Sequence, residues 1–422
     1  MIENKSNVKV KVIDMPIGIE NNNIISYIKN NPDKKYIVVT DTCDALELIQ
    51  NNLKDMNFSG LPDKNRNKAL EELLSNNRNV VIDSIALFLM NEACKELVKN
   101  NHYTMVSNNC ISLVLNSDIK KTHIQEFLIP NKLLIIGKNN TVKYDEELSK
   151  KKFLKKCPAL SLYLINIGES YLVDKSNIVS FTRKETIESF DEVIFISFLF
   201  DGSMTRYYLD FMKIEYEYYC IEDNKLVKGI YDYSDLKSSI GDKLNIYDGK
   251  MNKVANSNNA LSMQWYANSQ LTSEHDTVRK NIYNYKRNIS KSTTKDFLWT
   301  VHDIPHKNTP HFYNPEISVK KTTYRRSTNK CIIPEIDRKS LAYCTNVYVN
   351  SFHYRLFRKN GVKIDEDEFS TSMMMNWVVN SCVSNSETVN IYIPSKRMRD
   401  LLCTWCRIPL LKVDRPLTKK KK

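Results

Sequence analysis

The stretch VKVKVIDMPIGIENNNIISYIKNN, residues 8–31, decides the fold of the first part of the chain. Residues 8–13 are rich in β-branched side chains and predict a strand, whereas residues 22–31 have the apolar spacing of a helix. The turn between them contains Gly18. A strand, a glycine-containing turn and a helix form the usual setting of a phosphate-binding loop. The turn is therefore a candidate nucleotide site.

The residues that follow continue to alternate between strand and helix. Short apolar runs joined by amphipathic helices imply a parallel sheet that is covered on both faces. The predicted strands are residues 34–40, 78–84 and 103–107, and the predicted helices are residues 43–53, 67–77 and 86–101.

A second alternating section begins near residue 160. We expect a buried strand at 191–200, a helix at 202–214, a strand or hairpin at 215–227, a helix at 369–383, a strand at 388–394 and a helix at 395–406. The predicted fold class is α/β, with two RecA-like parallel-sheet domains. Their expected bounds are 1–158 and 159–415, with an insertion at about 250–335 in the second domain and a basic tail at 416–422.

The stretch 279–330 differs from both domains because it is basic, aromatic and without clear periodicity. It contains 12 Lys and Arg against 3 Asp and Glu, and seven aromatic residues are interleaved with them. Lysine and arginine can follow phosphates while aromatic rings stack on bases, so this stretch is the predicted nucleic-acid-binding region. A solvated basic loop that is anchored by its aromatic residues is the alternative. The candidate binding residues are Lys320, Lys321, Arg325, Arg326, Tyr283 and Trp299.

Composition indicates a globular protein with a polyanionic partner. The formal charge is +13, with 42% hydrophobic and 26% charged residues. We expect no membrane association, because no run of 18 apolar residues occurs, and a cytoplasmic location, because the N-terminus lacks a signal-peptide core. The ten cysteines have no framework spacing and are expected in the core, and no metal site is predicted.

Several segments resemble phage- and plasmid-type DEAD/DEAH-box helicases of superfamily two. VIDMPIGIENNNIISYI (12–28) is similar to their phosphate-loop segment, and KKYIVVTDTCDALELI (34–49) to the next helicase motif. Residues 79–115 resemble the stretch that leads into the Asp-Glu box. DEVIFISFLFDGSMTRYYLDF (191–211) and VNIYIPSKRMRDLL (389–402) resemble pieces of the second motor domain. The likeness covers residues 8–410 through the order of its segments. It implies a P-loop nucleoside triphosphatase fold, and a host-cell cytoplasmic location if the gene is carried by a phage.

The resemblance fails at the residues that bind the triphosphate. The family pattern Met-Pro-Thr-Gly-x-Gly-Lys-Thr appears here with Pro16 and Gly18 retained. Glu20, Asn21 and Asn22 replace the second glycine, the lysine and the hydroxyl residue. Two unit charges at ~4 Å and an effective dielectric of about 20 repel by roughly 4 kcal/mol, so Glu20 would oppose a phosphate. A helix N-terminus favours an anion by only about 0.3–1 kcal/mol.

The catalytic positions of the family are also substituted. Asn108 and Asn109 stand where the Asp-Glu box should be, and Ser84-Ile85 replaces a Thr-His pair. In the segment that resembles Gln-Trp-x-x-Arg-x-x-x-Arg, Trp377 is retained. The other polar positions of this segment are Asn376, Asn380 and Ser384. We therefore assign no catalytic residue and no cofactor, and ATP with magnesium would bind only if the family's function were retained.

Three hypotheses follow. The first is a helicase-like protein that binds nucleic acid, DNA in preference to RNA, with lost or very weak ATP hydrolysis; replication proteins are candidate partners. The second is an active ATP-dependent helicase with atypical motifs. The third is a protein-interaction scaffold without a nucleic-acid role.

Overall fold

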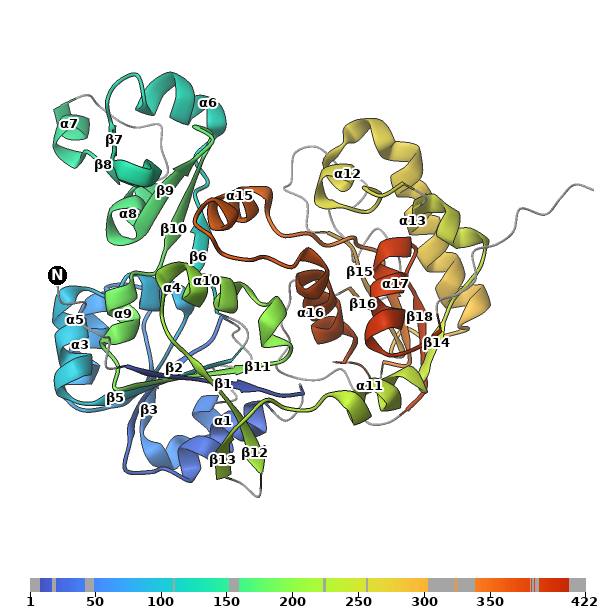
Figure 1. Ribbon diagram of the computed structural model, residues 1–422, viewed down its shortest axis with the longest axis horizontal. Coiled ribbons are helices and arrows are strands. Elements are labelled where there is room, and N and C mark those ends of the chain that lie inside the picture. The colour runs from blue at the N-terminus through green and yellow to red at the C-terminus, as the bar shows by residue number, and fades with distance from the viewer. Residues whose placement is uncertain are drawn as a thin grey trace, which may run out of the picture. The chain divides into compact units, whose positions relative to one another are not determined.

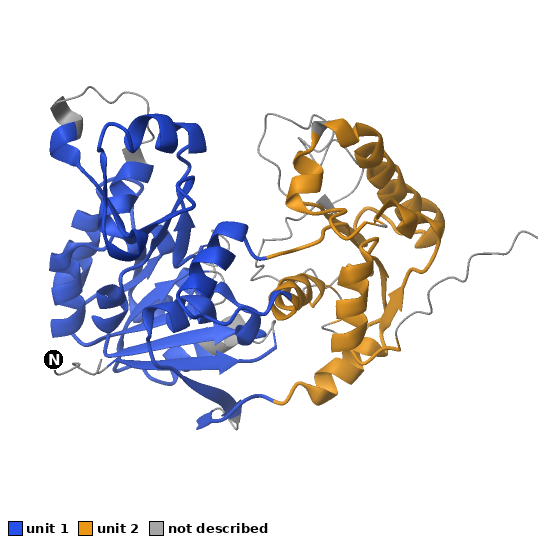
Figure 2. Cartoon of the chain, turned by 45° about the horizontal axis from the view of Figure 1, so that its top comes forward, with its two compact units in different colours: residues 1–231, 349–366 blue, residues 232–348, 367–422 orange. Residues whose placement is uncertain are grey.

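The structure is a computed structural model, and the description covers residues 8–16, 20–41, 49–108, 111–151, 159–222, 225–255, 257–302, 323–324, 338–379, 381, 383 and 387–409. The chain divides into two compact units, which Figure 2 shows in different colours. Unit 1 comprises Met1–Tyr231 and Val349–Glu366, and unit 2 comprises Asp232–Tyr348 and Asp367–Lys422. Each unit contains its own predominantly parallel sheet, so the α/β class predicted from the sequence is confirmed.

An eight-stranded sheet forms the centre of unit 1 (Figure 1). Its strand order is β13-β12-β1-β11-β5-β2-β4-β3, and every pair is parallel except the β12–β13 hairpin. All six residues of β11 are buried, which is the pattern of a strand covered on both faces. The strands are β1 (Lys9–Asp14), β2 (Lys35–Val39), β3 (Phe58–Gly60), β4 (Asn79–Ile82), β5 (Tyr103–Asn108), β11 (Glu192–Ser197), β12 (Glu217–Glu222) and β13 (Lys225–Lys228).

Helices connect the parallel strands. The helix predicted over 86–101 is instead two helices, because Asn91 accepts a hydrogen bond from the Cys94 N–H and so caps a new helix. Ser203 caps α10 in the same way, through the Arg206 N–H. The helices that accompany this sheet are α1 (Glu20–Lys29), α3 (Arg66–Ser75), α4 (Ser84–Phe88), α5 (Glu92–Asn100), α9 (Lys184–Glu188) and α10 (Met204–Met212).

The segment between β5 and β11 forms an additional part of unit 1. It contains an antiparallel sheet, β6-β10-β9, and a separate β7–β8 pair, with a core of its own around Leu128, Ile165 and Ile178. Its elements are β6 (Val114–Asn116), α6 (Lys121–His123), β7 (Leu134–Ile136), β8 (Val142–Tyr144), α7 (Glu146–Lys151), α8 (Ala159–Ile167), β9 (Glu169–Val173) and β10 (Asn177–Phe181).

The domain boundary expected at 158/159 differs from the observed division. Residues 159–231 belong to unit 1, and β11 lies between β1 and β5 in the first sheet. The apolar sequence of β11 showed that the strand is buried, but an apolar run carries no information about which sheet it joins. Its parallel pairing with β1, in which Glu192 lies opposite Lys9, could not be read locally.

Unit 2 is built around a five-stranded parallel sheet in the order β14-β18-β17-β15-β16. The helix predicted over 395–406 and the strand predicted over 388–394 correspond to α17 and β18, whereas the helix predicted over 369–383 overlaps α16 but ends earlier, at Val378. The elements are α11 (Ser234–Gly241), β14 (Leu244–Ile246), α12 (Met263–Ala267), α13 (Thr272–Asn284), β15 (Phe297–Thr300), β16 (Thr323–Tyr324), β17 (Ser340–Tyr343), α16 (Glu366–Val378), β18 (Val389–Tyr392) and α17 (Lys396–Trp405).

Part of the stretch that the sequence assigned to an insertion belongs to the core of unit 2. Strand β15 pairs with both β16 and β17, and its four residues are all buried. Helix α13 contributes Val278 and Ile282 to the same core cluster as Trp299. Residues 303–322 and 325–337 lie outside the described residues. Of the aromatic residues in this stretch, Tyr285, Phe297 and Trp299 therefore belong to the core.

Helix α15 (Ser351–Lys359) follows β17 in sequence but belongs to unit 1. The Phe357 ring meets those of Phe181 and Phe211 at centroid distances of 5.7 and 5.5 Å. Arg355 forms an ion pair of 2.6 Å with Asp174. The chain thus returns to the first unit and completes an aromatic core there. None of the described helices is long and apolar enough to cross a membrane.

Candidate functional site

The carboxyl ends of three neighbouring strands meet at one edge of the eight-stranded sheet. The parallel register places Asp14, the last residue of β1, opposite Ser197, the last residue of β11. On the other side of β11, Ile196 is opposite Asn108, where β5 ends. In open α/β sheets, ligands bind outside the carboxyl ends of the strands. This edge is therefore the candidate site, and it includes both the phosphate-loop segment and the position of the Asp-Glu box.

The candidate phosphate loop joins β1 to α1. The Met15 N–H donates a 2.7 Å hydrogen bond to the Ser197 carbonyl, which fixes the start of the loop against β11. Pro16 is buried and is the last described residue before the turn. Gly18 lies outside the described residues. Glu20, Asn21 and Asn22 form the first turn of α1, but their side chains are likewise not described, so their role in binding stays a prediction.

Asp14 is a residue of this edge to which the sequence analysis gave no role. Its carboxyl group is buried, with an exposed fraction of 5%, and Oδ1 accepts a 3.3 Å hydrogen bond from the Phe200 N–H. The carboxylate thereby ties the end of β1 to the loop after β11. In the sequence, the feature that could have indicated a role for Asp14 is its position directly after the predicted strand 8–13. The group lies at the base of the candidate loop, where an ionised carboxylate would oppose a nearby phosphate.

The next two strands of the sheet end in a polar network. Asp41 Oδ1 accepts a 2.7 Å hydrogen bond from the Ser84 N–H, and Ser84 Oγ accepts a 2.8 Å bond from the Ser112 N–H. Asp83 caps α4 and forms a 2.8 Å ion pair with Arg66. Ser84, which stands at the position of the family's Thr-His pair, therefore holds the chain after β5 in place. The network gives it a positioning role at this edge.

The substituted Asp-Glu box begins at this same edge. Asn108 ends β5, beside β11, and its assignment to the first position of the box stays a prediction. Its side chain is not described, and Asn109 lies outside the described residues. An amide has the shape of a carboxyl group but lacks its charge and basicity.

In unit 2, Asn376 and Trp377 lie near the end of α16. Asn376 Nδ2 donates a 2.8 Å hydrogen bond to the Ser372 carbonyl of its own helix. Trp377 is buried, and its ring meets that of Tyr343 at a centroid distance of 5.3 Å. Both contacts lie within unit 2: the first is internal to α16, and the second packs α16 against β17. Asn380 and Ser384 lie outside the described residues, so their assignment stays a prediction.

The candidate nucleic-acid-binding residues differ in their exposure to solvent and in whether the structure describes them. Trp299 is fully buried in β15 within the core of unit 2, so its indole ring is not available to stack on a base, and its assignment to the binding surface is corrected. Tyr283 lies on α13 with 44% of its surface exposed, which is compatible with stacking. The four paired charges lie outside the described residues and stay predictions: Lys320, Lys321, Arg325 and Arg326.

The cysteines of α17 and its C-terminus behave as core residues. Cys403 and Cys406 are both buried, and burial raises the pKa of the Cys406 thiol to about 12. Such a thiol stays protonated, which is unfavourable for metal binding or redox chemistry. Within the described ranges, no group of three or more His, Cys, Asp or Glu side chains is placed to hold a metal ion.

Sequence comparison relates this chain to a prophage protein. Residues 238–406 match the model of the YonV C-terminal Rossmann-like domain family. The SPbeta prophage-derived uncharacterized protein YonV of Bacillus subtilis (strain 168) is 27% identical over 418 residues, which cover 94% of this chain and 98% of that protein. The similarity therefore extends over both units.

Structural comparison supports the fold assignment. A solved structure titled XPD_Helicase has a TM-score of 0.50, with 10% sequence identity and coverage of 95% of each chain. The structure of S. tokodaii Xpd4 has a TM-score of 0.47, with 12% identity and coverage of 94% of each chain. The first of these supports the predicted fold class, α/β with two RecA-like parallel-sheet domains. At this level of identity, the likeness establishes the fold alone.

Proposed function

We propose that this chain is a helicase-like nucleic-acid-binding protein of the P-loop nucleoside triphosphatase fold whose ATP hydrolysis is lost or very weak. The observation that carries the proposal is the register that brings Asp14, Ser197 and Asn108 to one edge of the sheet. In P-loop nucleoside triphosphatases, the loop after the first strand cradles phosphates, and an acidic residue helps to hold magnesium. Here the strand next to β11 ends in an amide, so the metal would lose an anionic ligand.

The charges at this edge also disfavour a triphosphate. Asp14 and Asp41 contribute carboxylates, and Glu20 replaces a glycine of the loop. Asn21 replaces the lysine that would otherwise contact the terminal phosphates. One like-charge contact costs roughly 4 kcal/mol at ~4 Å and an effective dielectric of about 20, which exceeds the stabilisation of about 0.3–1 kcal/mol from a helix N-terminus.

Nucleic-acid binding is supported by charge and by the fold. The whole chain has a formal charge of +13, and the stretch 279–330 contributes +9 of it (12 basic minus 3 acidic residues). The structural neighbour is titled a helicase, and the relative is prophage-derived. We infer that the ligand is DNA in preference to RNA, and that the protein acts beside replication proteins in the cytoplasm of the host cell.

Fluorescence anisotropy with a labelled single-stranded oligonucleotide tests the nucleic-acid role. Affinity should fall by about tenfold or more between about 50 and about 200 mM salt, because bound phosphates release counterions. Reversing Lys320, Lys321, Arg325 and Arg326 to glutamate should weaken binding strongly. The matched control reverses the four terminal lysines, Lys419 to Lys422, and should weaken it less. The absence of binding at low salt to both DNA and RNA would favour the scaffold hypothesis instead.

Calorimetry with ATP and magnesium, with and without the oligonucleotide, tests the loss of hydrolysis. The unaltered chain should bind ATP weakly or not at all and release no phosphate. The triple change Glu20→Gly, Asn21→Lys and Asn22→Thr should increase nucleotide affinity without restoring turnover, because Asn108 and Asn109 remain. If the oligonucleotide stimulates phosphate release by the unaltered protein, and if this activity co-purifies with the protein, the chain is an active ATPase.

A further inference from the structure

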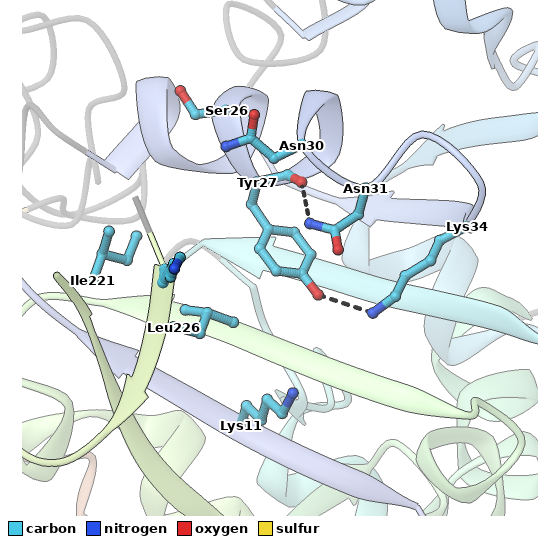
Figure 3. A pocket seen from close by; sticks show the side chains of 9 residues that line it. Lys11, Ser26, Tyr27, Asn30, Asn31, Lys34, Ile221 and Leu226 are labelled. Carbon is cyan, nitrogen blue, oxygen red and sulfur yellow. Dashed lines mark hydrogen bonds between the residues drawn. The ribbon is translucent and has the colours of Figure 1, made fainter. Parts of the chain in front are cut away.

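A second candidate ligand site lies on unit 1, at the β13-β12-β1 side of the sheet. It is a cavity of 350 Å³ between helix α1 and the β12–β13 hairpin (Figure 3). Its lining combines the last turn of α1 and Lys34, which directly precedes β2, with Ile221 of β12 and with Lys225 and Leu226 of β13. Pockets that bind small ligands start at about 300 Å³, so this cavity suits one compact ligand.

Three lysines give the cavity a positive charge. Lys11 Nζ and Lys34 Nζ lie 2.5 and 2.7 Å from the two carboxylate oxygens of Glu192. Burial alone would raise the pKa of Glu192, but the hydrogen bonds and charges of the two lysines hold it below its ordinary value. Glu192 therefore accepts hydrogen bonds from both ammonium groups. Each ammonium group has three N–H donors, which is more than its bond to Glu192 uses. Lys225, exposed on β13, adds a further charge, so these four groups sum to +2.

An aromatic ring is fixed beside these charges. The Tyr27 hydroxyl donates to Glu192 Oε2 at 3.2 Å and accepts from Lys34 Nζ at 3.1 Å. Two hydrogen bonds at its tip hold the ring in one orientation. Figure 3 shows the ring projecting from α1 into the space that Leu226 of the hairpin also faces. A fixed aromatic face beside an aliphatic side chain suits a planar ring system.

We propose that this cavity binds a nucleotide unit, with its phosphate near Lys11, Lys34 and Lys225 and its base against Tyr27. The unit could be a free mononucleotide or one nucleotide of a bound single strand, because both present the same phosphate and base. The site uses residues of unit 1 only and does not depend on the function proposed above. A neighbouring cavity of 740 Å³ is less suitable, because its four lysines are balanced by four carboxylates.

The test uses the full chain and magnesium-free adenosine 5′-monophosphate as the probe, titrated by calorimetry. Tyr27→Leu should weaken binding by at least about fivefold, since base stacking on one aromatic ring carries an effect of this size or larger. Lys225→Glu should weaken it by at least about as much, because it replaces an attractive charge beside the phosphate with a repulsive one. Tyr27→Phe keeps the ring and should bind within about twofold of the unaltered chain. Lys143→Glu is the matched control, because Lys143 is also an exposed lysine in a short strand, and its affinity should not change.

A labelled single-stranded oligonucleotide, titrated in parallel, identifies the source of the nucleotide. If Lys225→Glu weakens both probes, the site holds part of a strand, and if it weakens only the mononucleotide, the ligand is free. Mononucleotide binding that is sensitive to Lys225→Glu supports the site even when the oligonucleotide does not bind and the proposed function fails. Two results overturn the inference while leaving that function untouched: no mononucleotide binding, or binding that Lys225→Glu and Tyr27→Leu leave unchanged.

Discussion

Nε2 of His353, in helix α15, lies 3.0 Å from Oδ1 of Asn116, a residue of β6 that is 237 positions earlier in the chain. The oxygen of Asn116 can only accept a hydrogen bond, so the imidazole must donate from Nε2. His353 is buried, and burial lowers its pKa to about 4. The contact attaches α15 to the antiparallel sheet of unit 1 through a neutral imidazole.

The burial of His353 predicts a pH-dependent stability. An unfolded histidine takes up a proton below about pH 6.5, whereas the folded one resists protonation until about pH 4. The stabilising contribution is therefore complete above pH 6.5 and declines as pH falls toward 4, by up to about 3 kcal/mol. Urea unfolding at several pH values should show this loss. His353→Gln should be less sensitive over the same interval, and equal slopes for both proteins would contradict the assignment.

The aromatic core around α15 predicts a large cost for Phe357→Ala. Phe357 is fully buried and contacts the rings of Phe181, Tyr207 and Phe211. Removing a buried phenyl ring costs about 3–5 kcal/mol in the free energy of unfolding. Lys359→Ala, at an exposed position of the same helix, should change it by no more than about 0.5 kcal/mol. Similar effects of the two substitutions in chemical denaturation would show that α15 does not pack on unit 1.

The attachment of α15 shows where sequence reasoning fails. The helices α10 and α17 could be predicted from their apolar periodicity, and the strands β1, β2 and β18 from their short runs of β-branched and apolar residues. Contacts between distant segments have no local signature. The apolar run of β11 and the amphipathic pattern of α15 show that each buries a face, but the partner is set by packing across more than a hundred residues. The sequence therefore predicted two parallel-sheet domains but misplaced their boundary.

Gly168 lies where two segments of unit 1 approach closely. A Cβ atom at this position would lie 2.5 Å from Cζ of Phe88 and 2.9 Å from the Phe181 carbonyl oxygen. Gly168→Ala should therefore destabilise the protein by about 1–3 kcal/mol, as expected for overpacking. At Gly229 the nearest atom would be Cys220 Sγ at 3.8 Å, an ordinary contact. Gly229→Ala is the control, and its thermal unfolding should be close to that of the unaltered chain.

The candidate site could be located from the sequence better than its side chains could be interpreted. The strand and helix that flank the candidate loop, and the strand that ends at Asn108, could be predicted because their signals are local; the assignment of the loop and of the box stays a prediction. Asp14 was missed because one acidic residue after a strand has several ordinary roles. Trp299 was misassigned because a tryptophan in a basic stretch has the same composition whether its ring faces solvent or the core. The burial of Trp299 in the core of unit 2 distinguishes these cases.

The difference between Trp299 and Tyr283 gives a prediction that separates packing from binding. Trp299 is fully buried, so Trp299→Ala should cost about 3–5 kcal/mol in the free energy of unfolding. The milder change Trp299→Phe should leave oligonucleotide affinity unchanged, because the ring does not reach the surface. Tyr283 is 44% exposed, so Tyr283→Ala should alter stability by no more than about 0.5 kcal/mol.

If Tyr283 stacks on a base, Tyr283→Ala should lower oligonucleotide affinity by at least about fivefold, because each stacked base contributes about 1–3 kcal/mol. Thermal unfolding and fluorescence anisotropy of the same preparations measure both quantities. Tyr163 supplies the control, because it is an equally exposed tyrosine on α8 in unit 1. Equal affinities of the Tyr163→Ala and Tyr283→Ala proteins would remove α13 from the binding surface. Weaker oligonucleotide binding by a stably folded Trp299→Phe protein would instead show that the packing of β15 affects the binding surface.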